Sequence, residues 1–231
     1  TTFSSKSAGL RSETMLGTEL SGFGLRPSME DSLVVAISQS GTTTDTNRTV
    51  DLVRSRGAKV LAIVNRSQSD LTDKADGVLY TSDGRDLEMS VASTKAFYSQ
   101  IAAGFLLAAA VAEEVGGVVE QGLLAALREL PTAMVEVLAR RPAIAEAAHQ
   151  VAPAKRYWAV VGNGPNRIAA AEVRIKLSEL CYKSIASDGT EDKKHIDLSA
   201  EPLIVVCAAG LSGSTADDVA KEVAIYRAHK A

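Results

Sequence analysis

The chain has 231 residues, of which 46% are hydrophobic and 23% are charged, and its formal net charge is −3. This composition excludes a disordered chain and suffices for one large or two small hydrophobic cores. A mildly acidic chain without long basic runs is also unsuited to binding nucleic acid.

Short β-branched runs alternate with helical patterns from residue 33 onward. Strands are predicted at 33–37, 58–64 and 77–81, and helices at 43–56, 70–75 and 91–114. Gly57 stands where a helix-ending glycine is expected, and the helix before it should turn Val50 and Val53 inward. This order is typical of a parallel sheet covered by helices.

The hydrophobic stretch at residues 101–112 lies inside the last of these helices. It is shorter than the roughly 18 to 20 apolar residues that a membrane span needs. We therefore expect a buried core helix and no membrane partner.

The second half of the chain repeats the same order of elements. Two helices, at 120–130 and 132–150, should follow Gly116 and Gly117, and residues 151–156 should form a boundary. A strand at 157–161, a helix from 165 to about 182, a strand at 203–207 and a helix at 214–228 come next. The duplicated order predicts an α/β fold with two similar subdomains.

The two cysteines, Cys181 and Cys207, have hydrophobic neighbours, and nothing at the N-terminus resembles a secretory signal. We expect free buried thiols and a cytoplasmic protein. The chain begins with Thr1 rather than methionine, so we expect it to be part of a longer protein.

A polar stretch, A-I-S-Q-S-G-T-T-T-D-T at residues 36–46, follows the first predicted strand. The hydroxyls of Ser38, Ser40 and Thr43, with the N–H groups of the next helix, can surround one phosphate. The stretch lacks the lysine of a nucleotide-binding P-loop. A helix-capping turn explains the same residues equally well, so both interpretations stay open here.

Two further stretches carry candidate residues. Ser93 lies where a loop enters the long helix, and it could cap that helix or bind the same ligand as the 36–46 stretch. Glu172, Lys176 and Glu179 share one face of a later helix. This spacing is typical of an exposed salt-bridge ladder, and it fits acid–base chemistry only if Glu179 lines a cleft.

The remaining motifs are weaker. The G-N-G turn at 162–164 lacks the third glycine of a dinucleotide-binding loop, so a tight turn is enough to explain it. His195 lies in a charged loop that could simply be exposed. The histidines and cysteines do not have the spacing of a zinc site, so we expect neither a metal nor a cofactor.

Three motifs together resemble the sugar isomerase (SIS) domains of the glucosamine-6-phosphate synthase family, also called glutamine–fructose-6-phosphate aminotransferases. They are S-Q-S-G-x-T-x-D-T at 38–46, V-A-S-T-K-A-F at 91–97 and K-L-x-E-x-x-Y at 176–182. The resemblance covers the chain from about residue 17 to its end. It implies two tandem SIS-type subdomains, each a three-layer αβα sandwich, at 1–130 and 153–231 with a connecting helix at 131–152.

The resemblance also implies roles for individual residues. Four residues match positions that hold the sugar phosphate, and two match positions that contact the sugar. These six are Ser38, Gln39, Ser40 and Thr43 for the phosphate, and Val91 and Ser93 for the sugar. Glu179 matches the carboxylate that moves a proton between C1 and C2, with Lys176 beside it. His195 matches a ring-opening histidine supplied by the neighbouring subunit, so the resemblance implies a homodimer.

The function implied is that of the isomerase portion of a glucosamine-6-phosphate synthase, acting on a hexose 6-phosphate. Two alternatives remain. One is a related SIS deaminase, deglycase or isomerase, and the other is a sensor that binds a sugar phosphate without reacting. The presence of Lys176, Glu179 and His195 together disfavours the sensor.

Overall fold

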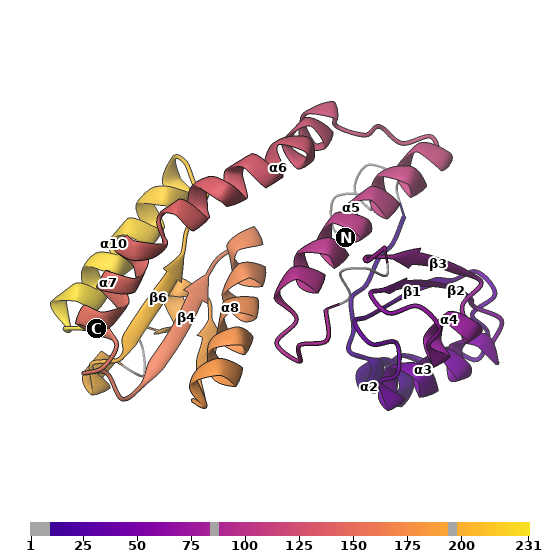
Figure 1. Ribbon diagram of the computed structural model, residues 1–231, viewed down its shortest axis with the longest axis horizontal. Helices are drawn as coiled ribbons and strands as arrows, with labels where there is room; N and C mark the ends of the chain where they lie inside the picture. Colours follow the sequence, from indigo (N-terminus) through magenta and orange to yellow (C-terminus); the bar gives the residue numbers. More distant parts are fainter. Residues whose placement is uncertain (1–9, 84–87, 194–197) are drawn as a thin grey trace. The chain divides into compact units, whose positions relative to one another are not determined.

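The structure is a computed structural model that describes residues 10–83, 88–193 and 198–231 (Figure 1). It divides into two compact units, Thr1–Leu130 and Pro131–Ala231, which are described separately. Each unit holds a parallel three-stranded sheet flanked by helices, so the predicted mixed α/β fold is confirmed. The predicted loop residues 194–197, His195 among them, lie outside the described residues.

Unit 1 is built on a sheet of order β1-β2-β3. Its strands are β1 (Leu33–Ser38), β2 (Lys59–Val64) and β3 (Gly77–Tyr80). Its helices are α2 (Gly17–Glu19), the π-helix η1 (Leu20–Gly24), α3 (Thr44–Arg54), α4 (Asp70–Lys74) and α5 (Thr94–Glu114). The predicted strands and helices are all present within a few residues of their expected ends, whereas α2 and η1 were not predicted.

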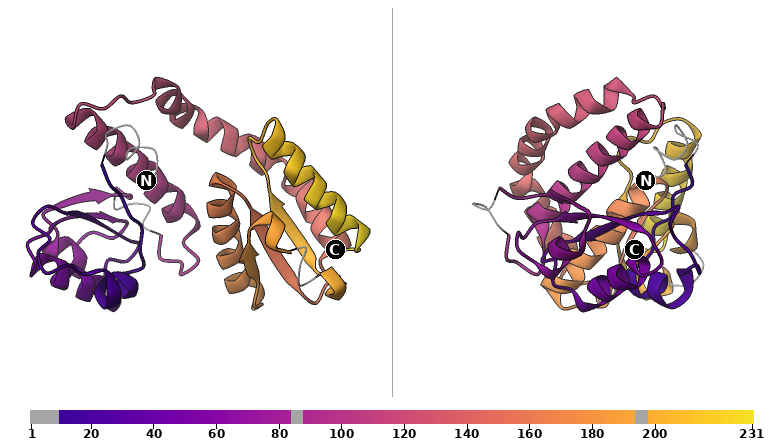
Figure 2. Two further views of the ribbon diagram at one scale, coloured as in Figure 1. Left: turned by 180° about the vertical axis from the view of Figure 1, so that it is seen from behind. Right: turned by 90° about the vertical axis from the view of Figure 1, so that its right-hand side faces the viewer.

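One face of this sheet carries the core of unit 1. Figures 1 and 2 show α3 and α4 on that face and α5 on the other. Val50 and Val53 of α3 are buried against Val60 and Ala62 of β2, as the sequence predicted. The parallel register, from Leu33 beside Lys59 to Ser38 beside Val64, brings the carboxyl ends of β1 and β2 to one edge of the sheet.

The opposite face is only partly covered. Helix α5 packs on β2, where Ile63 is fully buried, but Leu33 and Ile37 of β1 stay half exposed. Of the 21 residues of α5, Ala96 and Ala112 are buried. The predicted burial of this helix is therefore wrong for most of its side chains, because a three-stranded sheet covers one side of it. By length and composition α5 could cross a membrane, a test that core helices also pass.

Asp76 joins three elements at the edge of unit 1. Its Oδ2 accepts hydrogen bonds from the Val60 N–H (2.8 Å) and from Arg54 Nη1 (2.9 Å). The Val60 amide, and after it the Arg54 guanidinium, hold the pKa of Asp76 below its ordinary value. A depressed pKa in the folded state means that this carboxylate stabilises the fold above the ordinary aspartate pKa, and that the contribution is lost as the pH falls below it.

We therefore expect Asp76→Asn to lower the thermal midpoint at pH 7 and to lower it less at pH 3. Thermal unfolding of the parent chain and of Asp76→Asn, followed by circular dichroism at pH 7 and pH 3, measures the difference between their thermal midpoints. Asp73→Asn, at an exposed position of α4, is the matched control and should show no such change. If the thermal midpoint of Asp76→Asn lay equally far below that of the parent at pH 7 and at pH 3, the charged form of Asp76 would not be what stabilises the fold.

The helices between the two sheets differ from the prediction. Helix α6 (Gln121–Ala139) runs through Pro131, and α7 (Arg141–Val151) begins beside Pro142. The predicted helix break at residue 131 is thus wrong, because the break between α6 and α7 lies near residue 140. Proline fits the first turn of a helix, where its missing N–H has no intrahelical partner, so Pro142 starts a helix rather than interrupting one.

Unit 2 has a sheet of order β5-β4-β6. Its strands are β4 (Trp158–Gly162), β5 (Ala186–Asp188) and β6 (Leu203–Cys207), and its helices after α7 are α8 (Pro165–Cys181), α9 (Thr190–Lys193), the 3-10 helix η2 (Leu198–Ala200) and α10 (Ser214–Ala228). The elements β5, α9 and η2 were not predicted. Figure 1 shows α8 on one face of this sheet and α10 on the other.

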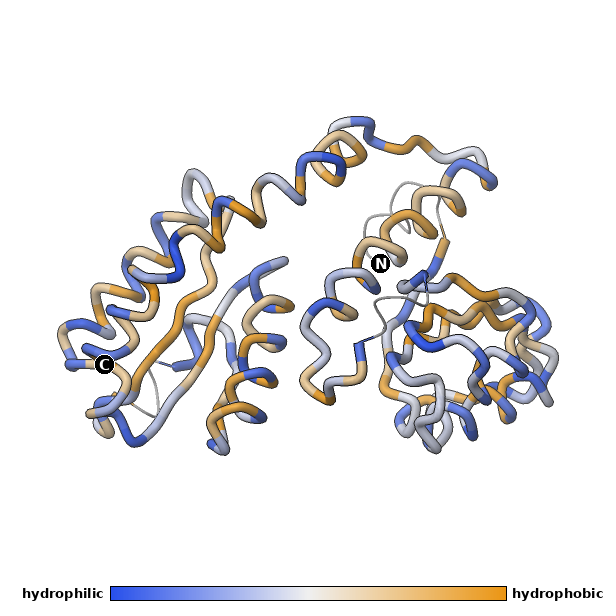
Figure 3. Tube along the Cα trace, viewed as in Figure 1, coloured by the Kyte–Doolittle hydropathy of each residue, from blue (hydrophilic) through white to orange (hydrophobic). Residues whose placement is uncertain are grey.

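Hydrophobic side chains fill both faces of the second sheet, and the hydropathy colours of Figure 3 follow β4 and β6. Val160 packs towards Ala170 of α8, and Val161 packs towards Tyr226 of α10. Trp158 starts β4 as the only tryptophan of the chain. Its indole N–H donates to the Lys155 carbonyl (2.8 Å), and Lys183 Nζ lies 4.9 Å from its ring centre.

Both cysteines are free thiols, as predicted. Cys207 is partly buried in β6, and burial raises the pKa of its thiol. The predicted burial of Cys181 is wrong, because this residue ends α8 and is exposed there.

Candidate functional site

The hydroxyl-rich stretch lies at the carboxyl edge of the sheet in unit 1. Ser38 is the last residue of β1, and α3 begins at Thr44. Residues 38–43, called the hydroxyl loop below, therefore join a strand end to a helix N-terminus. In parallel α/β sheets this is the edge where ligands bind, because helix N-termini present N–H groups without intrahelical partners there.

Gly41 fixes the shape of the hydroxyl loop. It has a φ of 70°, and its N–H donates to Ser38 Oγ (3.1 Å). Its carbonyl accepts from Asn47 Nδ2 (2.9 Å) and from the Leu71 N–H (3.1 Å). A Cβ atom at residue 41 would lie 2.0 Å from Ser69 Oγ, so the loop has no room for a side chain here. The loop is thus held in one conformation by α3 and α4.

The outer part of the loop presents hydroxyl groups beside the start of α3. Ser40 Oγ accepts from the Thr42 N–H (3.2 Å) and from Thr42 Oγ1 (3.0 Å), which leaves the Ser40 hydroxyl hydrogen able to donate outward. Thr43 is the N-cap of α3, and its side chain makes no capping hydrogen bond within the described part of the chain. The capping interpretation therefore does not account for Thr43, and the arrangement can bind an anion.

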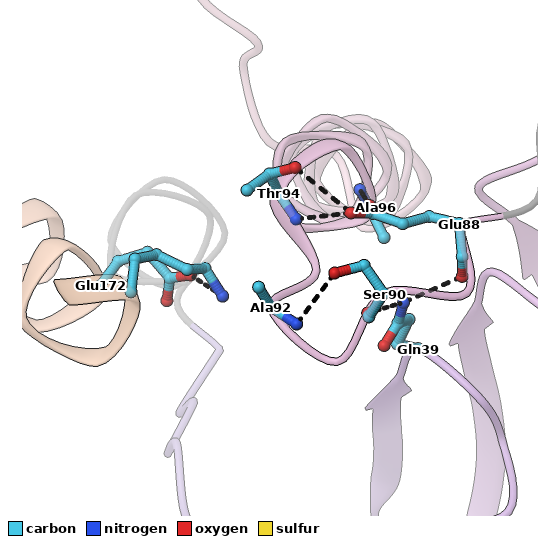
Figure 4. A network of polar contacts seen from close by, with 8 residues as sticks. Gln39, Glu88, Ser90, Ala92, Thr94, Ala96 and Glu172 are labelled. Atoms are coloured by element: carbon cyan, nitrogen blue, oxygen red, sulfur yellow. Dashed lines mark hydrogen bonds and ion pairs between the residues drawn. The ribbon is translucent and has the colours of Figure 1, made fainter. Parts of the chain in front are cut away.

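Gln39 ties the hydroxyl loop to the segment before α5. Its Nε2 donates to the carbonyls of Glu88 and Ser90, at 3.0 Å each (Figure 4). Asn65, which follows β2 and is buried, donates from Nδ2 to the same Glu88 carbonyl (3.2 Å). The ends of β1 and β2 therefore hold residues 88–90 in place.

The Glu88 side chain covers the N-terminus of α5. Its carboxylate accepts from the N–H groups of Thr94 (2.8 Å) and Ala96 (2.6 Å) and from Thr94 Oγ1 (3.2 Å), as Figure 4 shows. These bonds, the Ala96 amide first, hold the pKa of Glu88 below its ordinary value. The first turn of α5 thus contains a fixed negative charge.

Val91 and Ser93 lie in the turn between Glu88 and α5. The Val91 side chain is 87% exposed, and Ser93 is the N-cap with a φ of 52°. Among the described residues the Ser93 side chain makes no capping bond to α5, because Glu88 takes that role. Of the two alternatives that the sequence left open for Ser93, helix capping by its side chain is therefore not observed, and binding of the ligand stays a prediction.

The predicted acid–base residues belong to unit 2, on α8. Lys176 Nζ pairs with Glu172 Oε1 at 2.9 Å, and both side chains are about four-fifths buried. Glu179 lies farther along the helix and is exposed. The structure thus brings together Ser38, Gln39, Ser40 and Thr43 with the 90–93 turn in one unit, and it places Lys176 and Glu179 on one helix in the other.

Sequence reasoning missed three residues that shape the site: Asn47, Asn65 and Glu88. Each bonds to a backbone group that lies 4 to 23 residues away, or caps a helix from outside it. A carboxylate six residues before a helix start matches no local capping pattern. The weak signal available was that Asn65 ends a buried strand at the same edge as the hydroxyl loop.

Comparison with known proteins agrees with these motifs. Residues 16–110 match the SIS domain family. The glutamine–fructose-6-phosphate aminotransferase (isomerizing) of Mycolicibacterium smegmatis is 38% identical over 181 residues, which are 75% of this chain and 28% of that protein. The enzyme of the same name from Halobacterium salinarum is 34% identical over 73% of this chain and 28% of its own length. The chain therefore spans less than a third of these relatives.

Solved structures share the fold. The C-terminal domain of the glucosamine-fructose-6-phosphate aminotransferase of Francisella tularensis superposes with a TM-score of 0.84, at 23% identity, over 99% of this chain and 65% of that chain. The tagatose-6-phosphate ketose/aldose isomerase of Escherichia coli gives a TM-score of 0.58, at 17% identity, over 89% and 56%. Residues 16–110 of the chain thus match the SIS domain family, and about three quarters of the chain is similar in sequence to isomerizing glutamine–fructose-6-phosphate aminotransferases.

Proposed function

We propose that the chain is the isomerase portion of a glucosamine-6-phosphate synthase and that it binds fructose 6-phosphate or glucosamine 6-phosphate. The observation that carries this proposal is the hydroxyl loop, fixed at the N-terminus of α3 and bonded through Gln39 to the 88–90 segment. The loop offers hydroxyl and N–H donors without a lysine, which suits a phosphate that is gripped and never transferred.

Each site residue has a role in this proposal. Ser38, Gln39, Ser40 and Thr43 hold or shape the phosphate subsite, and the turn with Val91 and Ser93 contacts the sugar. Glu179 moves the proton between C1 and C2 with Lys176 beside it, and His195 opens the ring. A carboxylate is suited to the enediol step, and a histidine exchanges protons near neutral pH.

The wider organisation is part of the same proposal. Residues 1–130 and 153–231 form two SIS-type subdomains joined at 131–152, in a cytoplasmic homodimer in which His195 acts across the subunit interface. Two compact units that divide after Leu130, each with a parallel three-stranded sheet, support the boundary at residue 130. The relatives' names support the reaction class, and the deaminase and sensor alternatives become outcomes of the tests below.

The phosphate subsite is tested by Ser40→Ala. We expect fructose 6-phosphate to raise the thermal midpoint of the parent chain and the variant to bind it about tenfold more weakly or worse, because a hydrogen bond to a charged group contributes about 1.5–3 kcal/mol. Thermal shift across a ligand titration measures the difference.

Ser55→Ala is the matched control, since Ser55 lies at the other end of α3 and donates to the Leu52 carbonyl (2.8 Å). This control should bind like the parent. Equal protection of the parent and Ser40→Ala would rule out the hydroxyl loop as the phosphate subsite.

A further inference from the structure

The segments that lead into α3 and α5 are hydrogen-bonded to each other in unit 1, and the N-termini of the two helices differ in which groups lie at them. The start of α3 carries the hydroxyl loop, whereas the start of α5 carries the Glu88 carboxylate. The Gln39 amide links the two through the Glu88 and Ser90 carbonyls, so they belong to one hydrogen-bonded network (Figure 4).

The Glu88 carboxylate accepts hydrogen bonds from the donors at the N-terminus of α5 that could otherwise bind a second anion. The N–H groups of Thr94 and Ala96 and the Thr94 hydroxyl all point at its carboxylate, at 2.6–3.2 Å. An incoming phosphate would have to displace this carboxylate or lie beside a like charge, and like charges in contact across a binding interface are strongly unfavourable. Lys95, the second residue of α5, brings a positive charge to the same turn of the helix.

We propose that Glu88 is a specificity residue that restricts the site to sugar monophosphates and excludes bisphosphates. The inference rests on the proposed sugar-phosphate function of the hydroxyl loop. One phosphate binds at the N-terminus of α3, and the Glu88 carboxylate prevents a second phosphate from binding at the N-terminus of α5. The same carboxylate positions the 90–93 turn, which the sugar of a monophosphate contacts.

Binding of fructose 6-phosphate and fructose 1,6-bisphosphate to the 231-residue chain tests this. We expect the parent to prefer the monophosphate at least about tenfold, and Glu88→Gln to lose most of that preference by gaining affinity for the bisphosphate. The amide keeps the size of the side chain and an acceptor for α5. Asp70→Asn removes one charge at the start of α4 without uncovering α5, so it should keep the parental preference.

Calorimetric titration with inorganic phosphate supplies an independent measurement. Glu88→Ala should bind one more phosphate than the parent, and Lys95→Met in that background shows how much the ammonium contributes. If the parent binds no phosphate, the hydroxyl-loop assignment fails. If the parent and Glu88→Ala bind the same number and Glu88→Gln keeps the parental preference, the role of Glu88 is overturned. Circular dichroism of each variant confirms that α5 is retained.

Discussion

Gly41→Ala is expected to lower the free energy of unfolding of unit 1 by about 3 kcal/mol. A non-glycine residue in the left-handed region costs about 1–2 kcal/mol, and forcing extra atoms into a packed site costs about 1–3 kcal/mol. Both terms apply, because residue 41 has a φ of 70° and a new Cβ would lie 2.0 Å from Ser69 Oγ and 2.6 Å from Ser69 Cβ. Denaturant titration followed by circular dichroism measures the loss.

A matched glycine separates the two terms. Gly116 has a similar φ of 76°, and among the described residues nothing lies within 4 Å of a Cβ built there. Gly116→Ala should therefore cost only the conformational term, about 1 kcal/mol. Adding Ser69→Gly to Gly41→Ala should recover part of the stability, because it removes both clashing atoms. Equal losses for the two alanine variants would show that the close approach to Ser69 is unimportant.

Glu179→Gln is expected to reduce exchange of the substrate's C1 and C2 protons with solvent by about 10²–10⁴-fold, the usual contribution of a positioned general acid–base group. The amide matches the carboxylate in shape but cannot accept the proton. Proton NMR of fructose 6-phosphate in heavy water, with the parent and variant chains, measures the exchange rate directly.

Glu146→Gln is the control for this variant, because Glu146 lies on α7 at an exposed position outside the proposed site. It should exchange protons like the parent. A parent chain that binds fructose 6-phosphate without any exchange would favour the sensor alternative, whereas exchange that survives in Glu179→Gln would assign the proton transfer to another residue. Release of ammonia from glucosamine 6-phosphate would favour the deaminase alternative.

Strands β1 to β4 and β6 were predicted from the sequence because each is a short run of mainly hydrophobic residues with a turn at its end. Buried runs such as 58–64 leave little choice of structure once helices cover both faces. β5 was missed because three residues, Ala-Ser-Asp, carry no strand pattern. The sequence predicted a helix break at Pro131, but α6 continues through this residue. The side chains of α6 around residue 131 are exposed rather than packed.

The sequence predicted the parts of the candidate site that are local in sequence, and it did not predict the contacts between distant residues. The hydroxyl loop and the V-A-S-T-K-A-F motif are local in sequence, so pattern alone found them. Gln39 and Glu88 are 49 residues apart, and the amide–carbonyl bond that joins them forms only in the folded chain, between the loop after β1 and the segment that leads into α5. No periodicity predicts such a bond, so the sequence did not identify Glu88 as the residue that caps α5, and it left the role of Ser93 open between capping and binding.

Because of the position of Trp158, tryptophan fluorescence can follow the unfolding of unit 2 separately from that of unit 1. Unit 2 holds the only tryptophan, fixed in β4 by the Lys155 carbonyl and by the Lys183 ammonium near its ring. Emission excited at tryptophan wavelengths therefore reports the unfolding of unit 2, and unit 1 contributes none of it. Gly41→Ala should shift the loss of helical ellipticity of unit 1. A fluorescence transition that stays in place would show that unit 2 unfolds independently of unit 1, and one that shifts with the ellipticity would show that the two units unfold together.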